Sequence, residues 1–444
     1  MSVEPAAAWP SSHISMLVLA AIARGAAGVS VSHGSHIFAV ATRSDDAAAF
    51  DRFVEQYGRG YSQGSSEYNE RYALFRQSLA EVDALNAAAG GKFSAGINKF
   101  ADQTEAERRR VLGYRRAARP GGAPPPAASL LQQSAASVPD EISYANLTTA
   151  SWIMNQGSCG SCWAVAAAGL LDTHYELAYG ARKRQFSPQE LVSCVGNPRH
   201  CGGKGGCDGA TVELAMEYAM RHGLSDLRHT PYEGVTGSCR RHSGEGAALS
   251  EGGGVSREGL KFGLRGWRKL GENSEVDLLR ALMGGPVGVS VDGSHWFSYS
   301  SGVWPHCKKN SVVNHAVALF GYKAGPDSYW LIRNSWGRDW GEKGFIRLAR
   351  SENEESNCGV DKDPQQGTGC DGGPSEVTVC GACGILYDNV VPDFVPKGEL
   401  ESLAAGAAGG SSVIASFGTE FLEKLVPSAA GWSQLVRREW RRDA

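Results

Sequence analysis

The 444-residue chain exceeds the usual size of a single domain, and its 42% apolar content is enough for a sizeable core. A formal net charge of −3 gives no reason to expect nucleic acid or an anionic membrane as a partner. Eleven cysteines, an odd number, favour an oxidising compartment in which one thiol stays free for chemistry.

An apolar stretch at residues 14–23 lies near the amino terminus. It is too short to span a bilayer but suits the core of a signal peptide, and small residues follow it as cleavage candidates. We therefore predict a signal peptide over residues 1–28; the alternative is an alanine-rich leader. No later stretch of the sequence is long and apolar enough to be transmembrane. The expected location is the secretory pathway, a lysosome or vacuole, or the extracellular space.

Apolar and aromatic residues recur at helical spacing from about residue 50 to residue 90. Six residues fall on one helix stripe, at i, i+4, i+8, i+11, i+15 and i+19: Glu67, Arg71, Phe75, Ser78, Val82 and Asn86. A second motif has alternate spacing: Gly96, Asn98, Phe100 and Asp102. We predict a helical domain over residues 45–112, followed at 113–137 by a basic and then Pro/Gly/Ala-rich linker that is exposed to proteolysis.

The stretch from Gln156 to Ala164 places a cysteine at the start of a helix. An alanine-rich apolar run follows Cys162 and ends at Gly180, so the thiol lies in the first turn, where the helix dipole favours a thiolate. Lowering a thiol pKa from about 8.5 to about 4 requires roughly 6 kcal/mol, whereas a helix terminus supplies about 2 at best. A nearby cation must supply the remainder.

His315 is the candidate cation. It lies in an apolar run, residues 312–319, that is typical of a half-buried strand. Asn334 follows another strand-like run, and its side chain can accept the imidazole N–H and fix the tautomer, while Trp336 keeps water away from that bond. Each residue alone has an ordinary interpretation. The Cys159-x-x-Cys162 pair alone also fits a redox dithiol, or half of a zinc site completed by Cys380 and Cys383.

Together these residues resemble a papain-type cysteine peptidase of the cathepsin L kind. The resemblance implies an α+β, two-lobed fold, a helical lobe plus a β-barrel-like lobe, preceded by a helical propeptide domain. It makes Cys162 the nucleophile, His315 its acid and base, Asn334 the residue that orients His315, and Gln156 an oxyanion-hole donor. Further strands are expected at 264–267, 285–291, 329–334 and 344–348. The catalytic domain is expected at residues 138–390 and a low-complexity tail at 391–444.

The two N-terminal motifs resemble the propeptide of cathepsin L-like zymogens, which lies along the active-site cleft in the direction opposite to substrate. An unrelated helical domain is the alternative. We hypothesise that protonation of Asp102 loosens this region in acid. The segment Gly206-Cys207-Asp208-Gly209-Ala210 resembles the turn that pairs with extended substrate, with Ala210 in place of the usual Gly. The expected substrate-binding residues are Gly209, Ala210, Asn314 and Trp336.

By the same resemblance Cys159 pairs with Cys207, and Cys194 with Cys239. Spacing from Asn334 favours Cys307 with Cys358, although the sequence after Cys383 looks like the closing strand of the family, so an insert separates them. Cys201, Cys370 and Cys380 therefore leave the pairing in the second lobe open. Stapling disulfides are favoured over a zinc site in an oxidising compartment.

The expected function is that of an endopeptidase made as a zymogen, which hydrolyses peptide bonds through a Cys-His pair and an acyl-thioenzyme. Its expected partners are protein and peptide substrates and its own propeptide, and we expect a monomer without metal or cofactor. One rival is a catalytically silent relative that serves as a storage or binding protein. The other is the zinc protein, which predicts bound metal.

Overall fold

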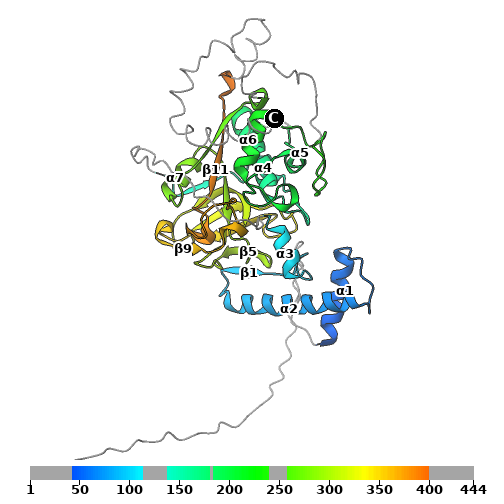
Figure 1. The fold of residues 1–444 in the computed structure, drawn as a ribbon. Helices are drawn as coiled ribbons and strands as arrows, with labels where there is room; N and C mark the ends of the chain where they lie inside the picture. Colours follow the sequence, from blue (N-terminus) through cyan, green and yellow to red (C-terminus); the bar gives the residue numbers. More distant parts are fainter. Residues whose placement is uncertain (1–42, 114–137, 181–183, 240–257, 400–444) are drawn as a thin grey trace, which may run out of the picture. The chain divides into compact units, whose positions relative to one another are not determined.

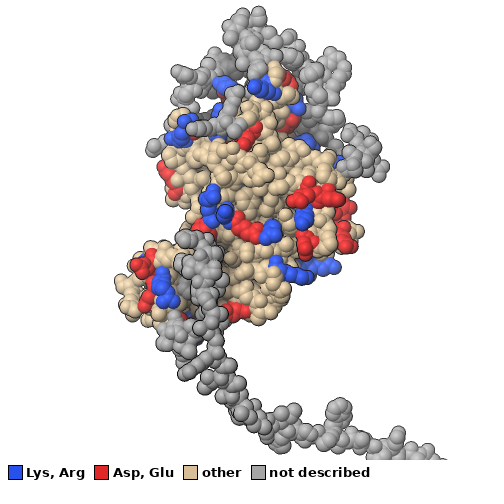
Figure 2. All heavy atoms as spheres, turned by 180° about the vertical axis from the view of Figure 1, so that it is seen from behind, with Lys and Arg blue, Asp and Glu red and all other residues tan. Residues whose placement is uncertain are grey.

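The computed structural model describes residues 43–113, 138–180, 184–239 and 258–399 (Figure 1). The predicted signal peptide, nearly all of the predicted linker and most of the predicted tail lie outside these residues. Within these ranges, no helix combines the length and apolarity that crossing a bilayer requires. On the face shown in Figure 2, acidic and basic side chains are interspersed in small groups.

The predicted propeptide domain is built from three helices and a short strand. Helix α1 (Arg43–Gln56) packs on α2 (Ser66–Ala88), β1 (Phe93–Ala95) follows, and α3 (Glu105–Val111) ends the domain. The helical pattern expected from residue 50 to residue 90 is thus interrupted by a turn, after which Ser65 caps α2 by accepting the N–H of Tyr68. Phe75 packs between Phe50 and Phe53, with ring centroids 5.2 and 5.0 Å apart, which joins α1 to α2.

One lobe of the main body is helical. Its central helix α4 (Cys162–Tyr179) is apolar on nearly all sides because α5 (Pro188–Cys194), α6 (Val212–His222) and the sheet pack around it. Ser187 caps α5 by accepting the N–H of Glu190, with Pro188 at its first position. The helix expected to start at Cys162 and to end at Gly180 is present.

The other lobe is built on a nine-stranded sheet, to which the propeptide domain contributes the edge strand β1. Its order is β1-β5-β8-β7-β6-β4-β11-β3, and β2 (Glu141–Ser143) also pairs with β6. The strands are β3 (Leu264–Lys269), β4 (Val287–Val291), β5 (Tyr299–Trp304), β6 (His315–Lys323), β7 (Tyr329–Arg333), β8 (Phe345–Ala349) and β11 (Asn389–Phe394). β3, β4, β6, β7 and β8 coincide with the predicted strand runs. The two-lobed α+β fold is therefore confirmed.

Strand β5 was not anticipated, and three further features of this lobe were also not anticipated. Helix α7 (Glu275–Leu282) precedes β4, and the insert forms a separate antiparallel pair, β9 (Cys358–Asp361) with β10 (Val377–Cys380). The domain boundary predicted at residue 390 is too early, because β11 continues to Phe394 and pairs with β3 along that length. Backbone pairing extends the sheet past the point where the sequence becomes Ala/Gly-rich.

The disulfides correct one prediction. Cys159 pairs with Cys207 and Cys194 with Cys239, as the resemblance implies. The predicted Cys307–Cys358 bond is wrong. Cys307 pairs with Cys383, because the β9–β10 register places Cys358 opposite Cys380 and these two form their own bond. Cys201 pairs with Cys370.

All eleven cysteines lie within the described residues, and ten of them are in disulfides. The zinc interpretation is therefore wrong, since Cys159, Cys380 and Cys383 are bonded to sulfur. Cys162 is the single free thiol.

Candidate active site

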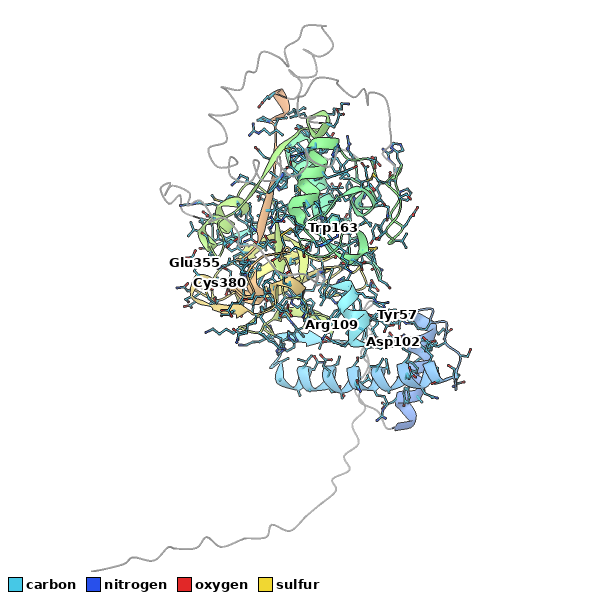
Figure 3. All side chains as sticks on the ribbon, viewed as in Figure 1. Tyr57, Asp102, Arg109, Trp163, Glu355 and Cys380 are labelled. Atoms are coloured by element: carbon cyan, nitrogen blue, oxygen red, sulfur yellow. A yellow bond between two sulfur atoms is a disulfide. The ribbon has the colours of Figure 1, made fainter. Side chains whose placement is uncertain are left out.

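The free thiol lies where the two lobes meet. Cys162 is the first residue of α4 and is fully buried, as is the neighbouring Trp163, which is labelled in Figure 3. The backbone N–H of Ala316, in β6, donates to Cys162 Sγ at 3.4 Å. Because Ala316 directly follows His315, the fold brings the nucleophile of one lobe to the candidate base of the other.

His315 is held by the side chains predicted to hold it. Its Nε2–H donates to Asn334 Oδ1 at 2.8 Å, and the Trp336 ring stacks on the imidazole with 5.0 Å between centroids. Since Nε2 carries the donated hydrogen, Nδ1 is left as the nitrogen for proton transfer, and it has no hydrogen-bond partner among the described residues. Trp336 is fully buried and keeps water from the His315–Asn334 bond.

Gln156 is fixed at both ends of its side chain. Its Nε2 donates to Val111 O at 2.9 Å and to Cys159 O at 2.8 Å, and its Oε1 accepts from Ser335 Oγ at 2.5 Å. A side-chain amide held beside the nucleophile is suited to stabilise a developing oxyanion.

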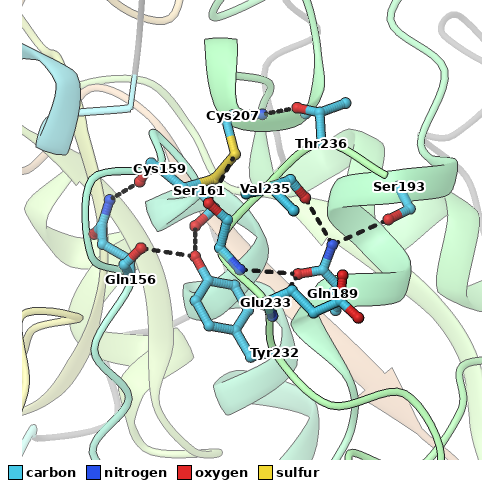
Figure 4. The surroundings of a disulfide bond; sticks show 12 residues. Gln156, Cys159, Ser161, Gln189, Ser193, Cys207, Tyr232, Glu233, Val235 and Thr236 are labelled. Carbon is cyan, nitrogen blue, oxygen red and sulfur yellow. Dashed lines mark hydrogen bonds between the residues drawn. A yellow bond between two sulfur atoms is a disulfide. The ribbon is translucent and has the colours of Figure 1, made fainter. Parts of the chain in front are cut away.

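Tyr232 supports the same loop, as Figure 4 shows. Its hydroxyl donates to Gln156 O at 2.9 Å and lies 2.5 Å from Ser161 Oγ, next to the Cys159–Cys207 disulfide. Sequence reasoning missed Tyr232 and Ser335. Neither carries a local signal, because both act only through contacts with residues far away in the chain.

The cleft is filled by the end of the pro-region. Cys162 Sγ–H donates to Leu112 O at 3.4 Å, and Val111 O takes a hydrogen of the Gln156 amide. At Gly113, φ is +77°, and a Cβ there would lie 2.2 Å from Cys162 Sγ, so only glycine fits. Gly113, predicted to begin the linker, therefore still lies against the nucleophile.

Burial beneath the pro-region favours the uncharged forms of Cys162 and His315. Burial raises the pKa of the Cys162 thiol to about 12 and lowers the pKa of His315 to about 4. Burial disfavours the charged form of each group, and no solvated ion pair exists to offset it. The described state is an inactive one.

The rest of the pro-region docks beside His315. Phe100 packs against Phe297 and Trp336, with ring centroids 5.1 Å away in each case, and Asn98 Nδ2 donates to Phe297 O at 2.6 Å. Strand β1 pairs with the edge strand β5, and Gly96 N–H donates to Ser298 O just beyond it. The pro-region thus covers Trp336, whose ring stacks on His315.

The first propeptide motif holds the pro-region together. Asn86 exchanges two hydrogen bonds with the Ala95 backbone, and Arg71 makes a bidentate contact with Glu107 at 2.5 and 2.7 Å, with Glu67 3.6 Å away. The Arg71 hydrogen bonds lower the pKa of Glu107 to about 2. The stability that this pair contributes is complete above the unfolded pKa and is lost only as pH falls toward 2. Loosening in milder acid needs another carboxylate.

Asp102 is the carboxylate named in the hypothesis on loosening of the pro-region. It is buried, accepts from Arg59 and Tyr61 at 2.7 Å each, and lies near Tyr57 in Figure 3. Replacing Asp102 with Asn removes the charge that Arg59 faces, so self-processing at neutral pH should approach the rate seen in acid. Timing the appearance of mature protein across pH checks this. The control is Glu105→Gln, which neutralises an exposed carboxylate on α3, and an unchanged pH profile for Asp102→Asn would exclude the hypothesis.

The predicted substrate-binding residues are only partly assembled around the thiol. Gly209 lies against Gly113, and the adjacent Ala210 is buried with a negative φ, so its methyl group causes no backbone strain. Asn314 instead holds a loop, donating to Ser294 Oγ at 2.8 Å and accepting from Gly293 N at 3.1 Å.

The two-lobed fold, with a free thiol at its centre and the end of a helical N-terminal domain lying over that thiol, defines the class to which the chain belongs. A family model for papain family cysteine proteases matches residues 138–368, and one for the cathepsin propeptide inhibitor domain matches residues 50–107. The chain therefore belongs to the papain family of cysteine proteases. Its N-terminal region is the inhibitor domain of a zymogen.

Named relatives agree. Cysteine protease 1 of Oryza sativa subsp. japonica is 30% identical over 335 residues, which cover 72% of this chain and 64% of that protein. Digestive cysteine proteinase 1 of Homarus americanus is 30% identical over 326 residues, covering 71% and 92%. The structure of digestive procathepsin L2 from Tenebrio molitor is similar, with a TM-score of 0.60 and 26% identity over 79% of this chain and all of that one. Less than two thirds of the Oryza protein's length is matched.

Proposed function

We propose that the mature protein hydrolyses peptide bonds in proteins and peptides through a Cys162 thiolate and a His315 imidazolium. The observation that carries this proposal is that the single free thiol, at a helix start, accepts the N–H of the residue next to His315. The His315–Asn334 and Gln156 contacts supply the other two catalytic elements.

In the proposed reaction the Cys162 sulfur attacks the carbonyl carbon and forms a C–S bond. The Gln156 amide and the Cys162 backbone N–H stabilise the oxyanion. His315 gives its proton to the leaving nitrogen as the C–N bond breaks, which leaves an acyl-thioenzyme and a neutral imidazole. Neutral His315 then takes a proton from water, the hydroxide adds to the thioester, and the C–S bond breaks to restore the thiolate and imidazolium.

Activation, in this proposal, is the removal of residues up to about 137. Cleavage in the 113–137 linker frees Val111, Leu112 and Gly113 from the cleft and lets water reach Cys162 and His315. The catalytic domain then begins near Val138. The five disulfides support a protein that matures in the secretory pathway and acts in a lysosome, a vacuole or outside the cell.

The test is to label the processed protein with a thiol-directed epoxide and to assay it on a fluorogenic peptide. We expect one label, at Cys162, with loss of both labelling and hydrolysis in the Cys162→Ala variant. A processed protein that folds but neither takes the label nor cleaves peptide would support the silent storage or binding protein instead. Endopeptidase action, expected from the sequence, further requires that the cleft be open at both ends.

A further inference from the structure

A disulfide joins the two lobes. Cys201 lies in the loop between α5 and the turn at Gly206–Asp208. The cysteines on either side of this loop, Cys194 and Cys207, pack on the core of the helical lobe. Cys370 lies in the insert between β9 and β10, which packs on the core of the sheet lobe. We name residues 199–202 and 369–371, with the Cys201–Cys370 bond, the clasp.

Hydrogen bonds reinforce the clasp on both sides of the disulfide. Gly202 N–H donates to Gly369 O at 3.0 Å, and Asp371 N–H donates to Arg199 O at 2.8 Å. His200 Nδ1–H donates to Asp371 Oδ2 at 2.7 Å. Two backbone contacts, one side-chain contact and a covalent bond make this a built connection rather than a chance approach of two loops.

The clasp lies beside the cleft at Gly209, the point that Gly113 of the pro-region also contacts. A Cβ on Gly209 would lie 2.0 Å from Gly113 O and 2.2 Å from Gly202 O, so these two carbonyls approach the same point. Gly113 follows Leu112, whose carbonyl accepts the Cys162 thiol. The pro-region in the cleft therefore has Gly202 of the clasp as a neighbour at Gly209.

The part of the clasp that belongs to the insert is held close to the start of strand β6, which begins at His315. Gln365 Nε2 donates to Cys370 O at 3.0 Å, and a Cβ on Gly367 would lie 2.1 Å from Val313 O, two residues before His315. The connection thus runs from the wall that carries Gly209 to the wall that carries His315.

We propose that the clasp closes the end of the cleft that receives the N-terminal part of the substrate. This inference rests on the proposed function and narrows it. The pro-region runs from Gln156 toward Gly209, and substrate is expected to run the opposite way, so residues before the scissile bond point at the clasp. A substrate chain advances about 3.3 Å per residue. Counted back from the scissile bond, its first two residues then occupy the positions of Leu112 and Gly113, and its third residue meets Gly202. The enzyme then releases short peptides from a chain's amino terminus instead of cutting anywhere within it.

The experiment uses processed enzyme and two series of quenched fluorogenic peptides that share the residues around the scissile bond. One series is extended from one to five residues on the N-terminal side, and the other is extended on the C-terminal side. We expect kcat/KM to fall at least tenfold when the third N-terminal residue is added, and to change little with C-terminal length. Equal or rising kcat/KM across the N-terminal series would overturn the proposal.

Opening the clasp should restore the cleavage of peptides that are long on the N-terminal side. We expect a Cys201→Ser variant in which a short Gly/Ser turn replaces residues 364–376 to lose the N-terminal length limit. The matched control is Cys358→Ser with Cys380→Ser, which removes a disulfide from the same insert without unlinking the lobes and should keep the limit. Epoxide labelling of Cys162 reports the folding of each variant, and the wild-type series decides the matter even where a variant does not fold. Absence of labelling and of cleavage in every peptide is failure of the proposed function, and is thus distinct from failure of the clasp.

Discussion

Replacing His315 with Ala is expected to lower kcat of the processed enzyme by roughly 10⁴-fold or more, the size of effect seen when one member of a catalytic unit is removed. The variant loses two things at once. It loses the cation that stabilises the Cys162 thiolate beyond what the helix start provides, and it loses the proton donor for the leaving nitrogen. Steady-state hydrolysis of a short peptide measures the effect.

His229→Ala is the matched control, because His229 is an exposed histidine in the same protein, and it should change kcat by less than about twofold. Asn334→Ala should fall between the two, since it keeps the imidazole but loses the 2.8 Å bond that fixes its tautomer. A His315→Ala enzyme with near-normal kcat would mean that some other group carries the proton.

Alkylation of Cys162 by iodoacetamide at pH 7 is expected to be at least about 10³-fold slower in the zymogen than in the processed protein. Burial raises the pKa of the Cys162 thiol to about 12, so the reactive thiolate is scarce at pH 7, and the Leu112 and Gly113 backbone also blocks approach. Removing the pro-region restores water and the His315 cation. Because the other ten cysteines are bonded, intact-mass measurement counts one thiol only.

Gly113→Ala provides the internal check on masking. The added Cβ would lie 2.2 Å from Cys162 Sγ, so the pro-region of the variant should move away from the thiol. Cys162 of the variant zymogen should then be alkylated faster than in wild type. Gly58→Ala is the matched control, since Gly58 also has a positive φ in the pro-region but has no atoms within 4 Å of the added Cβ. Equal rates for zymogen and processed protein would show that the pro-region does not mask the thiol.

Local patterns in the sequence were sufficient to single out Cys162, His315 and Asn334, which the fold brings together. A cysteine before an alanine-rich helix, a histidine opening an apolar strand and an asparagine after the next strand each occupy a recognisable setting within a few residues. Two of the strands found from sequence, β4 and β6, are buried on both faces, whereas β8 alternates between buried and half-buried residues.

Features that depend on distant partners were not predictable in the same way. Strand β5 has mostly small residues between Tyr299 and Trp304, and it is a strand because it pairs with β1 and β8. Strand β11 extends beyond its apolar residues because β3 pairs with it along that length. The error at Cys307 has the same origin. Spacing cannot show that Cys358 belongs to a hairpin whose own partner is Cys380.

The positions of Tyr232 and of the clasp illustrate the same limit at the site. Tyr232 acts on Gln156 across a sequence distance of 76 residues, and Cys201 reaches Cys370 across 169. The extra cysteine in the long Cys194–Cys207 loop was visible in the sequence. Its meaning, a bond between the lobes beside the cleft, appears only once the chain is folded.

The central claim is that folding brings Cys162 and His315 together as an ion pair once the pro-region leaves, and titration of the thiolate by its ultraviolet absorbance tests this most directly. For the processed wild-type protein we predict thiolate absorbance that persists well below pH 7, and for His315→Ala a titration displaced upward toward the ordinary thiol pKa of about 8.5. Identical titrations near 8.5 for both proteins would contradict the account.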